Sequence, residues 1–324
     1  MVATRSLHIV IAGGSGHLGT ILARHFHEQN QFVTVISRYP NVREWQTVHW
    51  EPPELGSWTE SLCGADVVIN LAGRSVNCRY SASHRREIKN SRIFTTALIG
   101  KAIAQSCHPP RVWMNASTAT IYRHSEDRPM DEISGEIGGN EPGLPSSWKF
   151  SIDVAASWEQ TFFSADTPHT RKVALRSAMV MSPDSGGAFN AFLGLVRYGI
   201  GGRAGPGRQF VSWIHAVDFI RAIEFLMTRE DLAGPINICS PFPIPNEEFM
   251  RSLRHAWCTS YIGVPAPEPL LELGALFLRT ETELVLKSRR VIPRRLLDAG
   301  FEFHFPNWRG ACEDLVQRWR ELHV

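Results

Sequence analysis

The sequence predicts an α/β fold: a doubly wound parallel sheet with a smaller C-terminal α/β lobe on the substrate side. Short β-branched segments alternate with amphipathic helical stretches, the first apolar segment runs into a glycine-rich loop, and the chain becomes proline-rich after Ser240. A length of 324 residues, 43% of them hydrophobic, suffices for about two domain-sized units and a large core.

Composition excludes several classes of protein. Lysine and arginine number 34 against 32 acidic residues, a net charge of +2, so we expect no nucleic-acid partner. No apolar run approaches the roughly 20 residues that span a bilayer, and the start of the chain runs into the glycine loop rather than a signal-peptide cleavage site. We expect a cytoplasmic protein without a membrane partner, and nothing in the sequence indicates an oligomer.

The cysteines are scattered along the chain. There is no CxxC pair and no cysteine–histidine cluster at the sequence spacing of a metal site. We therefore expect reduced, structural cysteines and no metal. The six are Cys63, Cys78, Cys107, Cys239, Cys258 and Cys312.

Apolar segments predict the strands in order. They are residues 7–12, 32–36, 66–71, 111–115 and 172–176. The nearly continuous apolar character of residues 67–71 indicates a strand that is covered on both faces. Apolar residues at helical spacing predict the intervening helices. These are residues 18–29, 84–105 and 154–163.

Two long segments, residues 123–147 and 182–209, are rich in glycine or proline and read as irregular. Both leave the carboxyl edge of the proposed sheet, so we expect them to wall an active site. We assign residues 1–181 and the returning segment 210–240 to a nucleotide-binding domain. Residues 182–209 and 241–324 form the substrate-side lobe.

Within that lobe the sequence predicts an apolar helix over residues 270–278 and an amphipathic helix over residues 308–323. Between them lies the basic stretch 287–295. Because Val291 and Ile292 interrupt it in a chain of balanced charge, we interpret it as the start of a helix with a solvated basic face.

The strongest motif is a strand that runs into Gly13, Gly16 and Gly19 and then into a helix. In a dinucleotide-binding Rossmann unit the first glycine permits the tight turn, the second lets the backbone approach a pyrophosphate, and the third allows close helix packing. The strand–turn–helix context makes the motif more specific than the glycines alone. The other interpretation is a tight turn without a ligand.

The end of the second strand indicates which dinucleotide would bind. An acidic residue there would accept hydrogen bonds from an NAD ribose, but this chain has Ser37 and Arg38. A hydroxyl followed by a guanidinium suits a 2′-phosphate. The sequence therefore predicts NADP(H) rather than NAD(H).

The glycine loop, the run Asn70-Leu71-Ala72-Gly73 and the stretch from Ser117 to Tyr122 together resemble the extended short-chain dehydrogenase/reductase superfamily. More narrowly, residues 7–306 resemble its atypical sugar-nucleotide epimerase-like family, with a DUF1731-type C-terminus, which includes bacterial proteins historically labelled cell-division inhibitors. The narrower resemblance rests on residues 79–93, 157–159, 175–183, 205–209, 212–215 and 288–297.

The resemblance implies an NADP(H) site at the carboxyl edge of the sheet. The residues it implies for the cofactor are Gly13, Ser15, Gly16, His17, Leu18, Gly19, Ser37, Arg38, Trp50, Leu71, Ala72, Gly73, Arg176 and Met179. Many relatives have glutamate or alanine where this chain has Arg74. That second cation either strengthens phosphate binding or points to solvent.

Hydride-transferring members of the superfamily use a tyrosine as general acid/base with a lysine four residues later. No tyrosine of this chain has a lysine at that spacing. Counted back from Trp158 and Glu159, the two positions hold Phe150 and Val154, neither of which can transfer a proton. Ser117 and Thr118 remain as hydroxyls for a substrate oxygen, or as a local hydroxyl–backbone turn.

Two side chains could replace the missing proton donor. Tyr122 is the phenol nearest to Ser117 in sequence, although the superfamily pattern packs it beyond the catalytic hydroxyl. His215 has a suitable ordinary pKa but also reads as a structural histidine.

Three arginines, Arg79, Arg92 and Arg208, would suit an anionic substrate such as a nucleotide-sugar phosphate or a carboxylate. Arg208 also reads as a solvent-facing loop residue. Trp213 would either cover a substrate ring or belong to the core of the lobe.

Two functional hypotheses follow. The first is an NADP(H)-dependent oxidoreductase or epimerase that acts on a small polar, nucleotide-sugar or anionic substrate beside Ser117 and Thr118, with protons from Tyr122, His215 or water. The second is a non-catalytic NADP(H)-binding protein with a regulatory or scaffold role, linked to cell division by the family's older label. The missing tyrosine–lysine pair favours the second, and the long cleft-facing loops favour the first.

Overall fold

The computed structural model describes residues 5–258, 263–267 and 281–323. It contains one seven-stranded parallel sheet with the strand order β10-β6-β5-β4-β1-β2-β3. The strands are β1 (His8–Ala12), β2 (Phe32–Ser37), β3 (Gln46–His49), β4 (Val67–Asn70), β5 (Val112–Thr118), β6 (Arg171–Ser177) and β10 (Gly234–Ile238). The predicted doubly wound sheet is confirmed.

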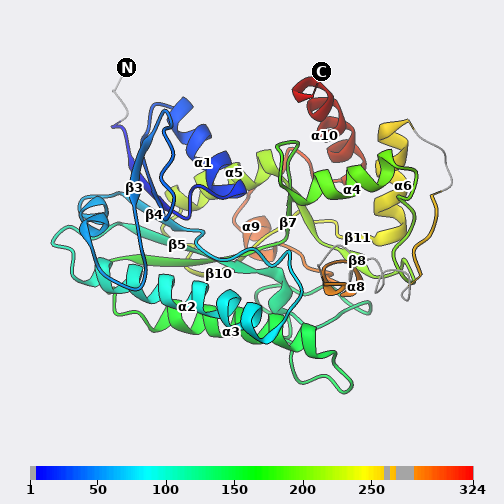
Figure 1. The fold of residues 1–324 in the computed structure, drawn as a ribbon, viewed down its shortest axis with the longest axis horizontal. Coiled ribbons are helices and arrows are strands. Elements are labelled where there is room, and N and C mark those ends of the chain that lie inside the picture. The colour runs from blue at the N-terminus through cyan, green and yellow to red at the C-terminus, as the bar shows by residue number, and fades with distance from the viewer. Residues whose placement is uncertain (1–4, 259–262, 268–280, 324) are drawn as a thin grey trace.

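Helices cover both faces of this sheet (Figure 1). On one face lie α1 (His17–Glu28), α5 (Ala216–Thr228) and α9 (Arg294–Asp298). On the other lie η1 (Ser57–Leu62), α2 (Ala82–Ala104) and α3 (Ser146–Ser164). Alternate residues of β1 point to opposite faces, so Ile9 and Ile11 belong to the first core and Val10 to the second. This two-sided burial explains why the strands are apolar without alternation.

A second, smaller layer lies beside the sheet (Figure 1). It contains α4 (Ala188–Arg197), α6 (Asn246–Trp257), α10 (Trp308–Leu322) and the two-stranded pairs β7 (Met179–Met181) with β9 (Trp213–His215) and β8 (Phe210–Val211) with β11 (Ile244–Pro245). Its core is aromatic: the rings of Phe249 and Trp308 stack at 4.1 Å, and Trp213 lies against Trp308 at 5.0 Å.

The structure corrects the prediction that residues 182–209 are irregular throughout. Helix α4 lies within this segment and buries Phe189, Phe192, Leu193 and Val196. These residues have helical spacing, but the glycines on both sides of the helix concealed the pattern.

The basic stretch also differs from its prediction. Residues 287–293 are not helical, and α9 begins only at Arg294. Lys287 is 1% exposed, so the predicted solvated basic face is wrong at this residue. The apolar helix predicted over residues 270–278 lies outside the described residues. Among the residues that are described, no helix has the length and hydropathy needed to cross a membrane.

Candidate functional site

The glycine loop follows β1 at the carboxyl edge of the sheet. Gly13 has a φ of +76°, and a Cβ at this residue would lie 2.7 Å from the backbone of Ala72. A Cβ on Gly19 would lie 2.4 Å from the Cα of Gly14. Both values are shorter than a real carbon contact, so the turn and the close approach of α1 require glycine at these residues.

Helix α1 begins with free backbone donors. Its N-cap is Gly16, no side chain caps it, and its first turn contains no acidic residue. The positive end of the helix is therefore open to an anion. His17 lies half-buried beside it, with Nδ1 3.2 Å from the carbonyl of Ser185 and a buried Nε2 that has no partner. A loop of the 182–209 segment thus lies against this helix end, and an ion pair of 2.8 Å between Arg24 and Asp184 joins the two.

The end of β2 adjoins the same loop. The hydroxyls of Ser37 and Ser15 are 2.8 Å apart. Arg38 is exposed, its guanidinium lies 5.8 Å from the ring centre of Tyr39, and it forms no ion pair within the described part of the chain. Trp50 is buried against Trp58. A hydroxyl and a guanidinium without an ion pair among the described residues therefore lie at the end of β2, next to the glycine loop.

At the end of β4, an amide network orients the next loop. Asn70 is fully buried; its Nδ2 donates to Asn115 Oδ1 at 2.6 Å, and its Oδ1 accepts the backbone N–H of Ala72 at 3.0 Å. This bond sets the direction of the chain through Leu71, Ala72 and Gly73. The loop thereby passes directly beside Gly13.

Two of the predicted basic residues lie at this loop. Arg92 Nη1 donates to the carbonyls of Arg74 and Ile88 at 3.0 Å, and burial lowers the pKa of Arg92 to about 10. A Cβ on Gly73 would lie 3.3 Å from its guanidinium carbon. Arg74 instead pairs with Glu87 on the surface of α2. The two arginines are brought together through the Arg74 backbone, and both are half-buried.

A chain of buried polar groups crosses the other half of the sheet. Strand register places Ser117 of β5 opposite Arg176 of β6, and Arg176 opposite Asn237 of β10. Ser117 Oγ donates to Glu159 at 2.6 Å, and the Arg176 guanidinium binds both carboxylate oxygens of Glu159 at 2.8 and 2.7 Å. Arg176 also donates to the Tyr122 hydroxyl, which donates to Asn237 Oδ1, both at 2.9 Å. We call these five residues the polar chain.

Three predicted site residues belong to the polar chain, and their polar side-chain atoms are hydrogen-bonded within it. Ser117, Tyr122 and Arg176 are 7%, 1% and 8% exposed. Burial raises the pKa of Tyr122 to about 12 even though the charge of Arg176 opposes this. Burial lowers the pKa of Arg176, but Glu159 outweighs this and raises it above its usual value. Thr118 differs: it is half-buried, and its Oγ1 accepts the backbone N–H of Thr120 at 3.1 Å.

The expected positions of the tyrosine–lysine pair are apolar here. Phe150 and Val154 lie on α3 and belong to a small cluster with Tyr80. The ring centres of Tyr80 and Phe150 are 5.1 Å apart in an edge-on arrangement. Burial raises the pKa of Tyr80 to about 12. Tyr80, which the sequence did not single out, is thus a phenol in contact with Phe150, one of the two positions at which the tyrosine–lysine pair was expected.

A buried charged cluster beside it was also missed by sequence reasoning. Lys287 Nζ donates to the carbonyl of Thr120 at 2.6 Å, and Arg289 Nε donates to the Thr120 hydroxyl at 3.0 Å. Glu283 accepts from Ser151 at 2.5 Å. Burial, reinforced by the charge of Arg289, lowers the pKa of Lys287 to about 7. No local signal marks these residues as buried, because Thr120, which Lys287 contacts, lies 167 residues away in sequence.

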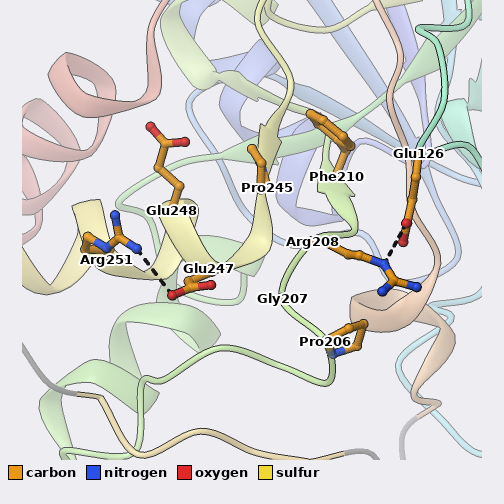
Figure 2. Close-up of a pocket in the computed structure, with 9 residues that line it drawn as sticks. All are labelled: Glu126, Pro206, Gly207, Arg208, Phe210, Pro245, Glu247, Glu248 and Arg251. Atoms are coloured by element: carbon orange, nitrogen blue, oxygen red, sulfur yellow. Dashed lines mark hydrogen bonds and ion pairs between the residues drawn. The ribbon is translucent and has the colours of Figure 1, made fainter.

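The remaining substrate-side residues lie apart from one another. Arg79 faces Glu281 at 3.8 Å. Arg208 lines a pocket of about 480 Å³ on the lobe, where its Nε donates to Glu126 at 2.7 Å (Figure 2). Across this pocket Arg251 pairs with Glu247 at 3.3 Å. Both guanidinium groups of the pocket are therefore already matched by carboxylates.

Trp213 and His215 lie within the lobe core. Both are 0% exposed. His215 caps α5: its Nδ1 accepts the backbone N–H of Val217 at 3.1 Å, while Nε2 lies 3.1 Å from Asp314. Its ring stacks on Phe305 at 4.0 Å. Burial lowers the pKa of His215 to about 4, so the ring is neutral at physiological pH and serves as a cap.

Comparisons with known proteins agree with this architecture. A model of the NAD dependent epimerase/dehydratase family matches residues 9–239, and a domain of unknown function, DUF1731, matches residues 266–315. The epimerase family protein SDR39U1 of Mus musculus is 31% identical over 96% of this chain and its own full length. The epimerase family protein ML0860 of Mycobacterium leprae is 30% identical, with 93% of each chain covered.

Solved structures give the same result. The human epimerase family protein SDR39U1, crystallised with NADPH, superposes with a TM-score of 0.82 at 27% identity, over 96% of this chain and 99% of its own. A nucleoside-diphosphate sugar epimerase from Corynebacterium glutamicum shares the fold, with a TM-score of 0.74 at 22% identity, over 98% of this chain and 62% of its own. The chain therefore belongs to the NAD dependent epimerase/dehydratase family.

Proposed function

We propose that this chain binds NADP(H) at the carboxyl edge of the sheet and acts as an oxidoreductase or epimerase on a small polar substrate, such as a nucleotide sugar or another anionic compound. The observation that carries the proposal is the junction of the glycine loop with β2, where the uncapped end of α1 adjoins Ser37 and the unpaired Arg38. The human relative solved with NADPH supports the same cofactor.

The residues of this edge fit the cofactor. Backbone donors around Gly16 and His17 would hold the pyrophosphate, and Ser37 with Arg38 would hold the 2′-phosphate. The Leu71–Gly73 loop, Trp50, Arg74, Arg176 and Met179 complete the proposed surroundings. When bound, the nicotinamide supplies or accepts a hydride.

Thr118 is the hydroxyl that we propose for the substrate oxygen, since it is half-buried at the end of β5. Ser117 and Tyr122 would act as positioning residues, because the polar chain already engages their hydroxyls. The phenol of Tyr80 is the further candidate for a proton donor, on the strength of its contact with Phe150.

Cofactor choice is tested by fluorescence titration with NADPH and NADH. Arg38→Ala removes a charge-assisted contact worth about 1.5–3 kcal/mol, so NADPH affinity should fall by about 10- to 100-fold while NADH affinity stays unchanged. Arg43→Ala, on the same exposed segment, is the matched control and should leave both affinities unchanged. Equal losses of NADPH and NADH in Arg38→Ala would contradict a phosphate contact.

Turnover is tested by NADPH consumption with a panel of carbonyl compounds and sugar nucleotides. Once a substrate is found, Thr118→Val should lower kcat and Tyr80→Phe should change its pH profile, whereas the exposed Tyr198→Phe should do neither. If Tyr122→Phe alone abolished turnover, Tyr122 would be the proton donor instead.

A second candidate is a non-catalytic NADP(H)-binding protein with a regulatory or scaffold role. The apolar pair Phe150 and Val154 favours it, because this position then lacks a proton-transfer group. Tight NADPH binding without turnover across the whole panel would support this alternative and exclude the enzyme.

A further inference from the structure

The opposite edge of the sheet carries a separate group of reactive side chains. Strands β4 and β5 are parallel neighbours with Val67 opposite Val112, so the loops that lead into them meet at the amino edge. Cys63 follows η1 in one loop, and Cys107 with His108 follows α2 in the other. Sequence spacing alone did not predict this cluster, because 44 residues separate the two cysteines.

The ligand atoms of these residues converge. The two sulfur atoms are 3.5 Å apart, and Cys63 Sγ lies 3.9 Å from His108 Nδ1. The three ligand atoms all lie within 4.8 Å of one another, and all three residues are exposed. Among the described residues, this is the one group of cysteine, histidine or acidic side chains with metal-binding geometry.

The backbone holds the two loops in this arrangement. The N–H of Gly64 donates to the carbonyl of His108 at 3.0 Å, which ties one loop to the other next to the ligands. Gly64 has a φ of +74°, a conformation that favours glycine and turns the chain towards β4. The ligand loops are therefore joined to each other as well as to the sheet.

These distances match a tetrahedral ion. With zinc–sulfur bonds of about 2.3 Å and zinc–nitrogen bonds of about 2.0 Å, tetrahedral angles give sulfur–sulfur and sulfur–nitrogen separations of about 3.8 and 3.5 Å. The observed 3.5 and 3.9 Å differ from these by a few tenths of an ångström. We propose that Cys63, Cys107 and His108 bind a divalent, thiolate-preferring metal ion such as Zn²⁺.

The chemistry of the three groups supports this ion. Two thiolates and an imidazole select borderline-soft metals over Mg²⁺ or Ca²⁺. The exposure of the cluster leaves a fourth position for water or for a ligand from outside the chain. The site lies at the edge of the sheet away from the glycine loop and does not depend on the proposed function.

The test is titration of the reduced, metal-free full chain with Co²⁺ and then Zn²⁺. We expect one equivalent of Co²⁺ with a thiolate charge-transfer band and the visible bands of tetrahedral cobalt, displaced by Zn²⁺. Cys63→Ser and Cys107→Ser should each lose the charge-transfer intensity and bind at least about tenfold more weakly, and His108→Ala should also bind about tenfold more weakly. The matched control is Cys258→Ser, which removes an exposed cysteine outside the cluster and should bind like the parent chain.

Several outcomes would overturn the proposal. They are the absence of a charge-transfer band in the parent chain, unchanged binding in Cys63→Ser and Cys107→Ser, or loss of binding in Cys258→Ser. A Cys63–Cys107 disulfide in the isolated protein, combined with no metal uptake after reduction, would identify the pair as a redox couple instead. NADPH titration of Cys63→Ser should match that of the parent chain, which shows that the variant is folded.

Discussion

The two halves of the sheet's carboxyl edge are built in different ways. Around β1, β2 and β4 the edge is formed mainly by backbone: Gly13 and Gly19 remove side chains, and the first turn of α1 presents free N–H groups. Around β5, β6 and β10 the edge is formed by side chains that bond to one another in the polar chain. The first half is open to an anion, whereas the second has already used its polar groups internally.

This difference shows why a cofactor site is easier to recognise than a catalytic one. Backbone N–H groups donate to a phosphate, and the backbone can approach it closely where no Cβ stands in the way. Glycine is the only residue without a Cβ. A hydroxyl such as that of Ser117 is reactive or inert according to its partner. The partner of Ser117 is Glu159 on α3, which lies 42 residues away in sequence.

The largest expected effect comes from breaking the polar chain. Glu159→Gln leaves the Arg176 guanidinium buried without a carboxylate, which should lower the free energy of unfolding by about 3–5 kcal/mol. Urea denaturation monitored by tryptophan fluorescence measures this change. Glu313→Gln, which breaks an exposed ion pair with Arg309, should cost no more than about 1 kcal/mol. Equal losses in the two variants would show that the buried pair contributes no more to stability than the exposed one.

In the half of the edge around β1, β2 and β4, we expect substitutions that disturb the backbone to have the next largest effect. Gly13→Ala puts a Cβ 2.7 Å from the Ala72 backbone at a φ of +76°, so we expect a loss of about 1–3 kcal/mol together with loss of NADPH binding. Gly310→Ala is the control, since this glycine lies inside α10 with nothing near its Cβ position. That variant should gain about 0.5–1 kcal/mol. If Gly13→Ala kept full NADPH affinity, the glycine loop would not bind the pyrophosphate.

His215 lies in the lobe, and we expect it to make the stability of the protein depend on pH. The pKa of His215 is lowered to about 4 in the folded chain, whereas it is about 6.5 when unfolded. Between these values only the unfolded chain binds the proton, so stability should fall as the pH drops from about 6.5 towards 4, by at most about 1.4 kcal/mol per pH unit. His215→Asn keeps a capping group and should flatten this slope.

The measurement is the free energy of unfolding between pH 4.5 and pH 7 by urea titration, about the range in which a histidine of this kind changes charge. His169→Asn, at an exposed residue, serves as the control and should keep the parent slope. An unchanged slope in His215→Asn would mean that another group causes the acid sensitivity.

The smallest effect concerns the side-chain contact within the half of the edge around β1, β2 and β4. Ser37→Ala removes the hydroxyl that lies 2.8 Å from that of Ser15, a loss of about 0.5–1.5 kcal/mol. Thermal unfolding with and without NADPH should show a larger decrease for the bound form, because Ser37 adjoins the proposed phosphate site. A decrease of the same size in both forms would restrict Ser37 to a structural role.

Local patterns account for the parts of the fold that were predicted correctly. Apolar runs identified β1, β2, β4, β5 and β6 to within a few residues, since a strand covered on both faces is apolar over most of its length. Helix α4 was missed because glycines flank a short apolar pattern. Lys287 was misread because its burial depends on Thr120, which reaches it only in the folded chain.

The sequence by itself determined five of the seven strands of the sheet, the glycine loop and the Ser37–Arg38 pair, since each depends on residues that are neighbours along the chain. Strands β3 and β10 were not predicted. Only the tertiary structure decided which polar groups are free. Strand register joined Ser117, Arg176 and Asn237 into one closed chain, and loop entry into β4 and β5 brought Cys63 to Cys107 and His108. Reactivity depends on distances of about 3 Å between side chains, and such distances between remote residues are set by packing.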